Sequence, residues 1–268
     1  MKKQLTVKKD NALINASYTL TTSEKRLILL AAAEARGNIE ELKGLRLHAS
    51  IYADTFKVEM QTAYEVLQEA AETLFERRVT YYEGKKKTVT RWVSHITYAA
   101  GEGYIEIGFA PKVQPLLCEI ETRFTAYDLK AIAPLTSIYA IRLYELIIAW
   151  RSTFKTPVIE VIDLRKKLGV EKNEYARMTD FKRRVLDFAI KQINQHTDIT
   201  SSYEQKKRGR KITGFSFTFK QKNAVKTLSK KPKREQITKK EAEKKAHIGE
   251  SWPDLLKRLA PDFHIIDL

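Results

Sequence analysis

The sequence predicts an α+β protein in which one order of elements occurs twice. Apolar residues recur at helical spacing in two long segments, 60–77 and 179–194, and each follows a shorter helical segment. Each long helix leads into period-two strands joined by a turn rich in Lys and Gly. This is the order of a helix-turn-helix with a β-hairpin wing. We therefore predict two tandem winged-helix domains, related by a pseudo-two-fold repeat and followed by a basic C-terminal tail.

The first domain is expected over residues 13–130. Thr21 and Glu24 have the spacing of a capping box, which begins a helix that Gly37 can end. The later elements are a short strand at 45–48, a short helix at 50–56, the long helix at 60–77, and an antiparallel meander of strands at 78–82, 90–98 and 104–109. Two prolines keep any helix brief in the segment 111–122.

The second domain is expected over residues 131–220, with the boundary near 126–136. Its elements are an apolar helix at 136–150, a strand at 156–162, a short helix that ends at Gly169, the long helix, and a basic hairpin at 201–219. The turn residues Tyr82–Lys86 resemble Tyr203–Lys207, although coincidence can explain so short a match. Together with the shared order of elements, the match favours two copies of one fold.

The tail, residues 221–268, begins with a stretch that is rich in Lys and poor in large apolar residues. Such a stretch cannot bury a core, so we expect the tail to be partly disordered.

The chain of 268 residues has a formal net charge of +16, from 49 Lys and Arg against 33 Asp and Glu. Because the basic residues cluster, the excess predicts salt-dependent attraction to a polyanion; a surface that only confers solubility is the alternative. The one cysteine, Cys118, excludes an intrachain disulfide and favours a reducing cytoplasm. The polar N-terminus is unlike a signal peptide, and no apolar run is long enough to span a bilayer, so we expect no membrane association.

The long helix of the second domain has an outer face that suits base reading. At about 100° per residue, a buried stripe is expected at Phe181, Val185, Phe188, Ala189 and Ile193. The opposite face carries Arg183, Arg184, Asp187, Lys191 and Asn194. In the major groove, arginine pairs with guanine and asparagine with adenine. A solvated face that only keeps the helix soluble is the alternative.

The start of this helix and the turn after it add further candidates. Arg177 and Lys182 lie near the helix start, which Thr179 is expected to cap and where helix-turn-helix proteins contact bases. Phosphate contacts are expected from the turn residues Lys206, Lys207, Arg208, Arg210 and Lys211.

The long helix of the first domain is acidic, so only its start and the following turn suit DNA. These candidates are Lys57, Gln61, Thr62, Lys85, Lys86, Lys87 and Arg91. We therefore expect the first domain to supply phosphate contacts, self-association, or both.

No residue pattern indicates an enzyme, a cofactor or a metal ion. The phosphate-loop pattern GxxxxGK[ST] is absent, the five histidines are dispersed, and one cysteine cannot form a zinc knuckle. A tyrosine-based nicking enzyme would need clustered metal-binding histidines. We expect a non-enzymatic protein that binds double-stranded DNA.

Five segments carry a family resemblance: Tyr18-Thr19-Leu20, Glu24-Lys25-Arg26, Arg123-Phe124-Thr125, Tyr139 to Glu145, and Arg177 to Arg184. In this order and at this spacing they resemble the replication initiator proteins of iteron-containing theta plasmids. The resemblance covers about residues 13–220 and not the tail. It departs from a family member at Thr179, which stands where that protein has proline.

The resemblance implies two winged-helix domains that bind directly repeated origin sequences, the iterons, as a monomer. It also implies a dimer, formed through the first domain, that represses the initiator's own gene. Chaperones convert dimer to monomer, and the monomer helps to recruit the host initiator and the replicative helicase. Most base reading in this family falls on the second domain, and here on Arg177, Lys182, Arg183 and Arg184. A winged-helix repressor without a replication role is the alternative.

Overall fold

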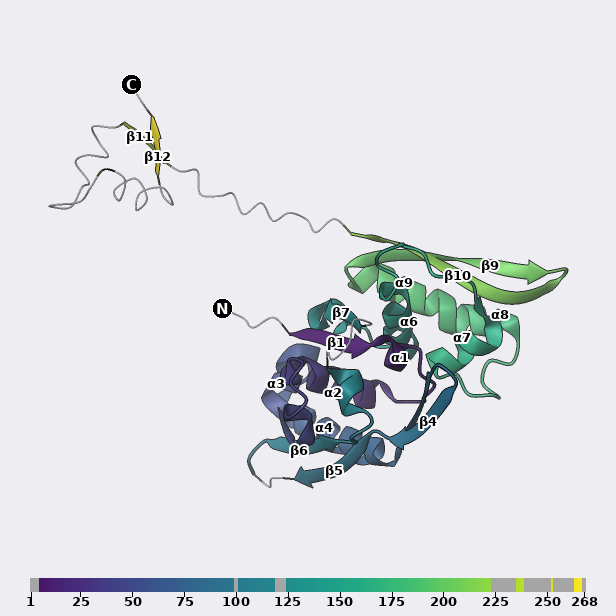
Figure 1. The fold of residues 1–268 in the computed structure, drawn as a ribbon, viewed down its shortest axis with the longest axis horizontal. Coiled ribbons are helices and arrows are strands. Elements are labelled where there is room, and N and C mark those ends of the chain that lie inside the picture. Colours follow the sequence, from purple (N-terminus) through teal and green to yellow (C-terminus); the bar gives the residue numbers. More distant parts are fainter. Residues whose placement is uncertain are drawn as a thin grey trace. The chain divides into compact units, whose positions relative to one another are not determined.

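A computed structural model gives the fold and describes residues 5–98, 101–118, 124–222, 235–238, 252 and 263–266 (Figure 1). The chain divides into two compact units, residues 1–221 and 222–268. In the second unit, β11 (Glu235–Thr238) pairs in parallel with β12 (Phe263–Ile266). The expected disorder of the tail falls mainly on residues outside those described and stays a prediction.

The first domain is a winged helix built on α2 (Thr22–Ala35), α3 (Ala49–Phe56) and α4 (Met60–Glu76). Its sheet contains β2 (Leu45–His48), β5 (Val93–Tyr98) and β6 (Tyr104–Phe109), in the order β2-β6-β5. The predicted capping box is confirmed. Thr21 Oγ1 accepts from the Glu24 N–H at 3.2 Å, and the Glu24 carboxylate accepts from the Thr21 N–H at 2.7 Å.

The predicted three-stranded meander is wrong. β3 (Arg78–Glu83) and β4 (Lys86–Arg91) form a separate two-stranded sheet, which we call the inserted hairpin. The chain leaves this sheet at Trp92, which is fully buried. Its ring packs edge-on against the ring of Tyr18, with 5.0 Å between the ring centres. This buried side chain separates β4 from β5 within a segment whose sequence alternates without a break.

An N-terminal strand extends the ordered structure upstream of residue 13, the expected start of the first domain. β1 (Thr6–Asp10) pairs antiparallel with β7 (Phe124–Asp128), and both Val7 and Lys9 are fully buried. The short helices of this part of the chain are α1 (Asn11–Ile14), η1 (Glu41–Lys43), η2 (Gln114–Leu117) and α5 (Leu129–Ile132). The brevity of η2 agrees with the expected effect of Pro111, which precedes it, and Pro115 within it.

The second domain repeats the topology of the first. Its helices are α6 (Ile138–Ile148), α7 (Val161–Leu168), α8 (Met178–Phe181), the π-helical η3 (Lys182–Asp187) and α9 (Phe188–His196). Its sheet contains β8 (Ile159–Glu160), β9 (Ile199–Arg208) and β10 (Lys211–Gln221), in the order β8-β10-β9. The pseudo-repeat predicted from the sequence is therefore present, with β2, β5 and β6 equivalent to β8, β9 and β10.

This equivalence changes which hairpin is the wing of the first domain. The topological wing is β5–β6, and the described residues of that hairpin include no Lys or Arg. The basic residues expected on a wing lie instead on the inserted hairpin, which has no counterpart in the second domain.

A buried charge cluster joins the two domains around α6. The Glu145 carboxylate accepts from Lys9 Nζ at 2.9 Å, Lys25 Nζ at 2.7 Å and the Tyr127 hydroxyl at 2.6 Å. Arg142 lies 3.6 Å from the same carboxylate. Lys9, Lys25, Arg142 and Glu145 are at most 1% exposed.

The cluster contains three cations and one carboxylate. Burial lowers the pKa of Lys9 to about 8, and it also lowers the pKa of Lys25. Burial alone would raise the pKa of Glu145, but the adjacent ammonium groups of Lys25 and Lys9 hold it well below its usual range.

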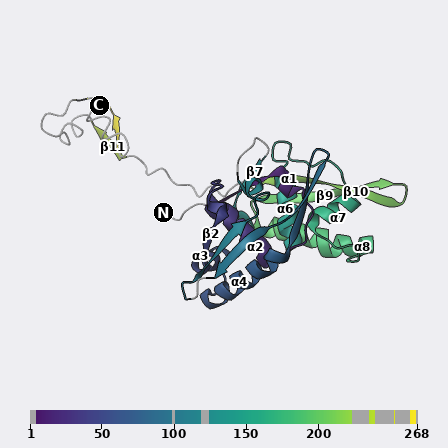
Figure 2. The same cartoon turned by 60° about the horizontal axis from the view of Figure 1, so that its bottom comes forward.

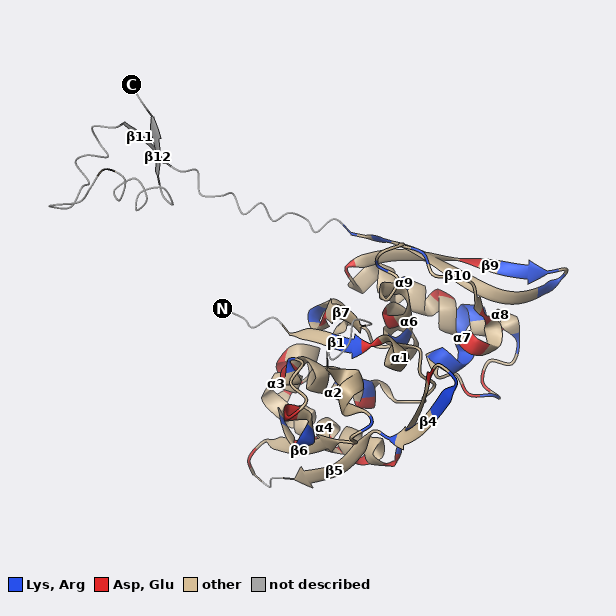
Figure 3. Cartoon of the chain, in the orientation of Figure 1, with Lys and Arg blue, Asp and Glu red and all other residues tan. Residues whose placement is uncertain are grey.

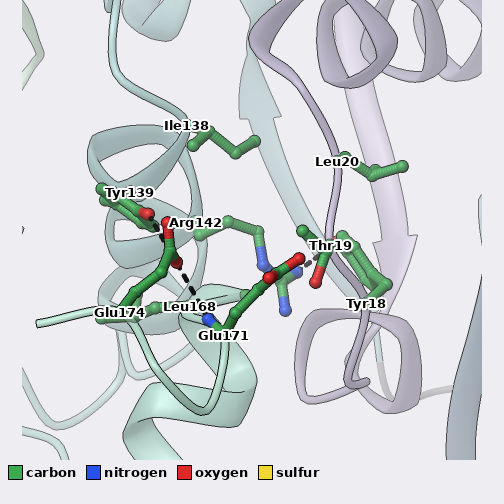
Figure 4. A pocket seen from close by; sticks show the side chains of 10 residues that line it. Tyr18, Thr19, Leu20, Ile138, Tyr139, Arg142, Leu168, Glu171 and Glu174 are labelled. Carbon is green, nitrogen blue, oxygen red and sulfur yellow. Dashed lines mark hydrogen bonds between the residues drawn. The ribbon is translucent and has the colours of Figure 1, made fainter. Parts of the chain in front are cut away.

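Arg142 connects this cluster to the end of α7. Its guanidinium donates to the carbonyl of Ala16 at 2.8 Å and to the carbonyl of Lys167, at the end of α7, at 2.8 Å. Beside it lies a pocket of about 200 Å³, lined by Tyr18 to Leu20 on one side and by α6 and the residues after α7 on the other (Figure 4). A Cβ atom on Gly169 would lie 2.7 Å from the Tyr18 carbonyl, so the backbones of the two domains meet there.

Candidate nucleic-acid interface

The long helix predicted in the second domain is continuous but contains a π-helical segment. We call α8, η3 and α9 together the recognition segment, Met178–His196. Phe188, expected in the buried stripe, is 46% exposed, whereas Leu186, which the projection did not place there, is fully buried. The other predicted core positions, Phe181, Val185, Ala189 and Ile193, are buried as expected.

The recognition segment begins two residues earlier than a Thr179 cap requires. Arg177 is the N-cap residue, and it makes no side-chain cap hydrogen bond. Thr179 lies in the first turn and is exposed, so the capping prediction is wrong. Both side chains lie at the exposed N-terminal end, the part of a recognition helix that meets bases in helix-turn-helix proteins.

The two central arginines differ in their surroundings. Arg183 forms an ion pair with Asp180 at 3.3 Å, and its side chain is 71% exposed, so this pair contributes little stability. Arg184 is exposed and has no partner in the described part of the chain. Lys191, further along the segment, is also exposed and unpaired within the same part.

Lys182 and Asn194 link the recognition segment to β9. Lys182 Nζ donates to Gln205 Oε1 at 3.3 Å and lies 6.0 Å from the centre of the Tyr203 ring. Asn194 Nδ2 donates to the Ser201 carbonyl at 2.9 Å, and its Oδ1 accepts from the Ser201 N–H at 2.7 Å. We expected Asn194 to read adenine, but the structure commits its amide to the backbone of β9.

The hairpin β9–β10, which we call the basic wing, projects beyond the helices (Figures 1 and 2). Its base is anchored by Phe215 and Phe217, both fully buried, and by Tyr203, whose hydroxyl donates to Asp187 Oδ1 at 2.6 Å. Burial, followed by the hydrogen bond to Asp187, raises the pKa of Tyr203, which therefore keeps its proton near neutral pH.

The outer half of the basic wing carries its predicted phosphate-binding residues, all exposed: Lys206, Lys207, Arg208, Arg210 and Lys211. Figure 3 shows this concentration of positive charge at the outer end of β9. Gly209, with φ of 60°, begins the two-residue loop between Arg208 and Lys211.

The proposed turn match between Tyr82–Lys86 and Tyr203–Lys207 does not hold as a match of turns. In the first domain the matched residues include the turn of the inserted hairpin, where Gly84 has φ of 60°. In the second they lie within β9, and the turn follows at Gly209. The evidence for the repeat is its topology.

The candidates of the first domain lie in separate places. Lys57 ends α3 in a left-handed conformation, and Gln61 and Thr62 lie in the first turn of α4; all three are exposed. The rest of the exposed face of α4 carries Glu65, Glu69, Glu72 and Glu76. A helix of this charge repels phosphate along most of its length.

The inserted hairpin presents Lys85, Lys86 and Lys87 to solvent, without partners in the described chain. Arg91 differs. Its Nη1 donates to the Phe75 carbonyl at 2.9 Å and pairs with Glu76 at 3.2 Å. We expected Arg91 to contact phosphate, but the structure uses it to hold the hairpin against the end of α4.

The described residues contain no cluster of three or more potential metal ligands. Nor does any described helix have the length and apolar character needed to cross a membrane. Cys118 is buried, and burial raises the pKa of its thiol to about 11, which suits a structural role.

Comparison with known proteins gives two family matches. Residues 6–148 match the family model described as "Initiator Replication protein, WH1", and residues 160–219 match "Initiator Rep protein, WH2". The first match includes all of α6, which we had expected in the second domain.

Three individual proteins are similar to this chain. An uncharacterised 27.6 kDa protein of Escherichia coli is 26% identical over 217 residues, which cover 76% of this chain and 90% of that protein. The crystal structure of the Pi initiator protein in complex with iteron DNA has a TM-score of 0.68 and 24% identity, covering 83% of this chain and 100% of that one. The WH1 domain of MSBI1.176, a replication protein isolated from a multiple sclerosis patient, is 41% identical, with a TM-score of 0.32, covering 37% of this chain and 78% of that one.

Proposed function

The chain belongs to the family of initiator replication proteins, and we propose that it initiates plasmid replication by binding directly repeated sequences in double-stranded origin DNA. The observation that carries this proposal is the pairing of two features in the second domain. Arg183 and Arg184 are exposed on the recognition segment, and the adjoining basic wing carries five exposed cations. The arginines suit base edges in a major groove, and the wing suits the neighbouring phosphates.

The related fold of the Pi initiator, solved in complex with iteron DNA, supports the same assignment. In this proposal the protein is not an enzyme: it opens the origin through binding and recruitment, and needs no cofactor. The first domain adds phosphate contacts through Lys57, Gln61, Thr62 and the lysines of the inserted hairpin, and mediates dimerisation. The dimer represses the initiator's own gene. The monomer recruits the host initiator and the replicative helicase, and chaperones convert dimer to monomer.

A footprint of the full chain on DNA beside its own gene tests the proposal. We expect protection of several direct repeats, with binding that weakens steeply as salt increases. The variant with Arg183→Ala and Arg184→Ala should remain folded and lose the sequence-specific footprint. Protection of a lone palindrome would favour a repressor without a replication role, and unchanged specificity in the double variant would refute the recognition-segment assignment.

A further inference from the structure

Phe188 is an exposed aromatic side chain in the recognition segment. It is 46% exposed, and it is absent from the set of partly buried residues that pack against the core. No ring or cation of the described chain stacks on it. A single exposed apolar residue is common on protein surfaces, so the neighbours of Phe188 decide what its ring can contact.

The neighbours of Phe188 place it on the face that the proposed function directs toward DNA. Arg184 lies four residues before it and Lys191 three residues after it, and all three side chains are exposed on the solvent side of the recognition segment. Both cations are exposed and unpaired within the described chain. The adjacent Asp187 carboxylate accepts from the Tyr203 hydroxyl, which holds this acid toward the basic wing.

Flanking cations that bind phosphates or guanine would bring the Phe188 ring to the edges of the bases. The phenyl group has no hydrogen-bond donor or acceptor, so it gains nothing from the polar edges of guanine, cytosine or adenine. Thymine alone presents an apolar group in the major groove, its C5-methyl group. We propose that Phe188 recognises a thymine in the binding site through contact with this methyl group, an inference that rests on the proposed DNA-binding function.

Replacing thymine with deoxyuridine deletes that methyl group and nothing else. The full chain first selects its site from a library of random duplexes, and each thymine of that site is then replaced in turn. For the wild-type protein, we expect one or two positions at which deoxyuridine weakens binding about fourfold, the weight of one buried methyl group. At the same positions the replacement should not change the affinity of Phe188→Ala.

Two further variants sharpen the comparison. Phe188→Gln keeps a long side chain but removes the apolar ring, and should lose the thymine dependence in the same way. Phe154→Ala is the matched control, because Phe154 is 47% exposed in the same domain but is not part of the recognition segment, and its ring lies 5.5 Å from that of Phe219, measured between ring centres. It should keep the full penalty for deoxyuridine.

A deoxyuridine penalty that persists in both Phe188 variants overturns the inference, because another side chain then reads the methyl group. The inference is equally overturned if the variants bind DNA normally and lose self-association, since the ring is then a protein contact. Failure of the wild-type chain to select any sequence is a different result, and it would reject the proposed function itself.

Discussion

Arg184 and Lys207 are both exposed and unpaired in the described chain, but they lie on surfaces of different shape. Arg184 lies on a helix that fits a groove, whereas Lys207 lies on the projecting half of the basic wing. We expect Arg184→Ala to weaken binding to the cognate site by about 1–3 kcal/mol and to relax base preference. Lys207→Ala should weaken all sequences alike and reduce the slope of log affinity against log salt by roughly one.

Titrations of both variants on cognate and scrambled duplexes, at several salt concentrations, separate these effects. Equal losses on both duplexes for Arg184→Ala would assign that arginine to phosphate and leave base reading to other side chains.

At the scale of elements, the sequence predicted what local periodicity determines. The capping box at Thr21, the order of the long helices and of the strands that follow them, and the repeat of that order were readable, whereas β1 and β7 were not predicted. The inserted hairpin was missed because the alternation of apolar and polar residues continues through Trp92. The burial of Trp92 against Tyr18 depends on tertiary packing, which local periodicity does not show. The exposure of Phe188 was missed because helical periodicity gives the direction of a side chain but not the width of the face that other elements cover, although an aromatic residue between two cations was a visible signal.

The role of Asn194 was also missed, because its position on a helix face does not show which groups its amide contacts. Its observed contacts predict how the basic wing is held. Both atoms of its amide hydrogen-bond to the backbone of Ser201 at the base of the basic wing. We expect Asn194→Ala to lower the free energy of unfolding by about 1–3 kcal/mol. Hydrogen exchange at the Ser201 amide should accelerate, while the ratio of cognate to scrambled affinity stays unchanged.

Lys191→Ala is the control for this variant, because Lys191 is exposed on the same helix and unpaired within the described chain. It should leave exchange at Ser201 unaffected. A loss of base preference in Asn194→Ala, with normal exchange, would restore the adenine-reading role.

At the scale of the whole molecule, the charge cluster around Glu145 is buried where the first domain contacts α6, and Arg142 connects it to the end of α7. Removing its one carboxylate leaves three buried cations without compensation, so Glu145→Gln should destabilise the protein by roughly 3–5 kcal/mol. Lys9→Met should be far milder, because Lys25 and Arg142 still compensate Glu145. The urea midpoints of the two variants measure the difference. Similar losses of stability would show that the carboxylate is no more important to the cluster than one of its cations.

The same cluster predicts how stability depends on pH. The folded protein binds the Lys9 proton with a pKa of about 8, against an ordinary value of 10.5, so the unfolded chain holds that proton more tightly. The contribution of Lys9 to the free energy of unfolding should therefore rise as pH increases from about 8 to 10.5. Over this window the difference in urea midpoint between wild type and Lys9→Met should change steadily. A constant difference would mean that Lys9 titrates normally.

Close packing between the domains should set the spacing of their DNA-binding surfaces. Gly169 has φ of 75°, and a Cβ atom there would lie 2.7 Å from the Tyr18 carbonyl. Gly169→Ala must therefore displace the backbone at this contact, and we expect the shift to change how the two domains pack. If both domains contact one site, this variant should lose more affinity on the full site than on sites trimmed at the end bound by the first domain.

Gly37→Ala is a matched control, because Gly37 has φ of 81° and a Cβ atom there would meet nothing within 4 Å. It imposes similar backbone strain without the contact between domains. Its ratio of full-site to trimmed-site affinity should equal that of the wild-type protein, whereas the ratio for Gly169→Ala should fall. Equal ratios for the two variants would mean that the domains contact DNA independently, and that the contact at Tyr18 contributes stability alone.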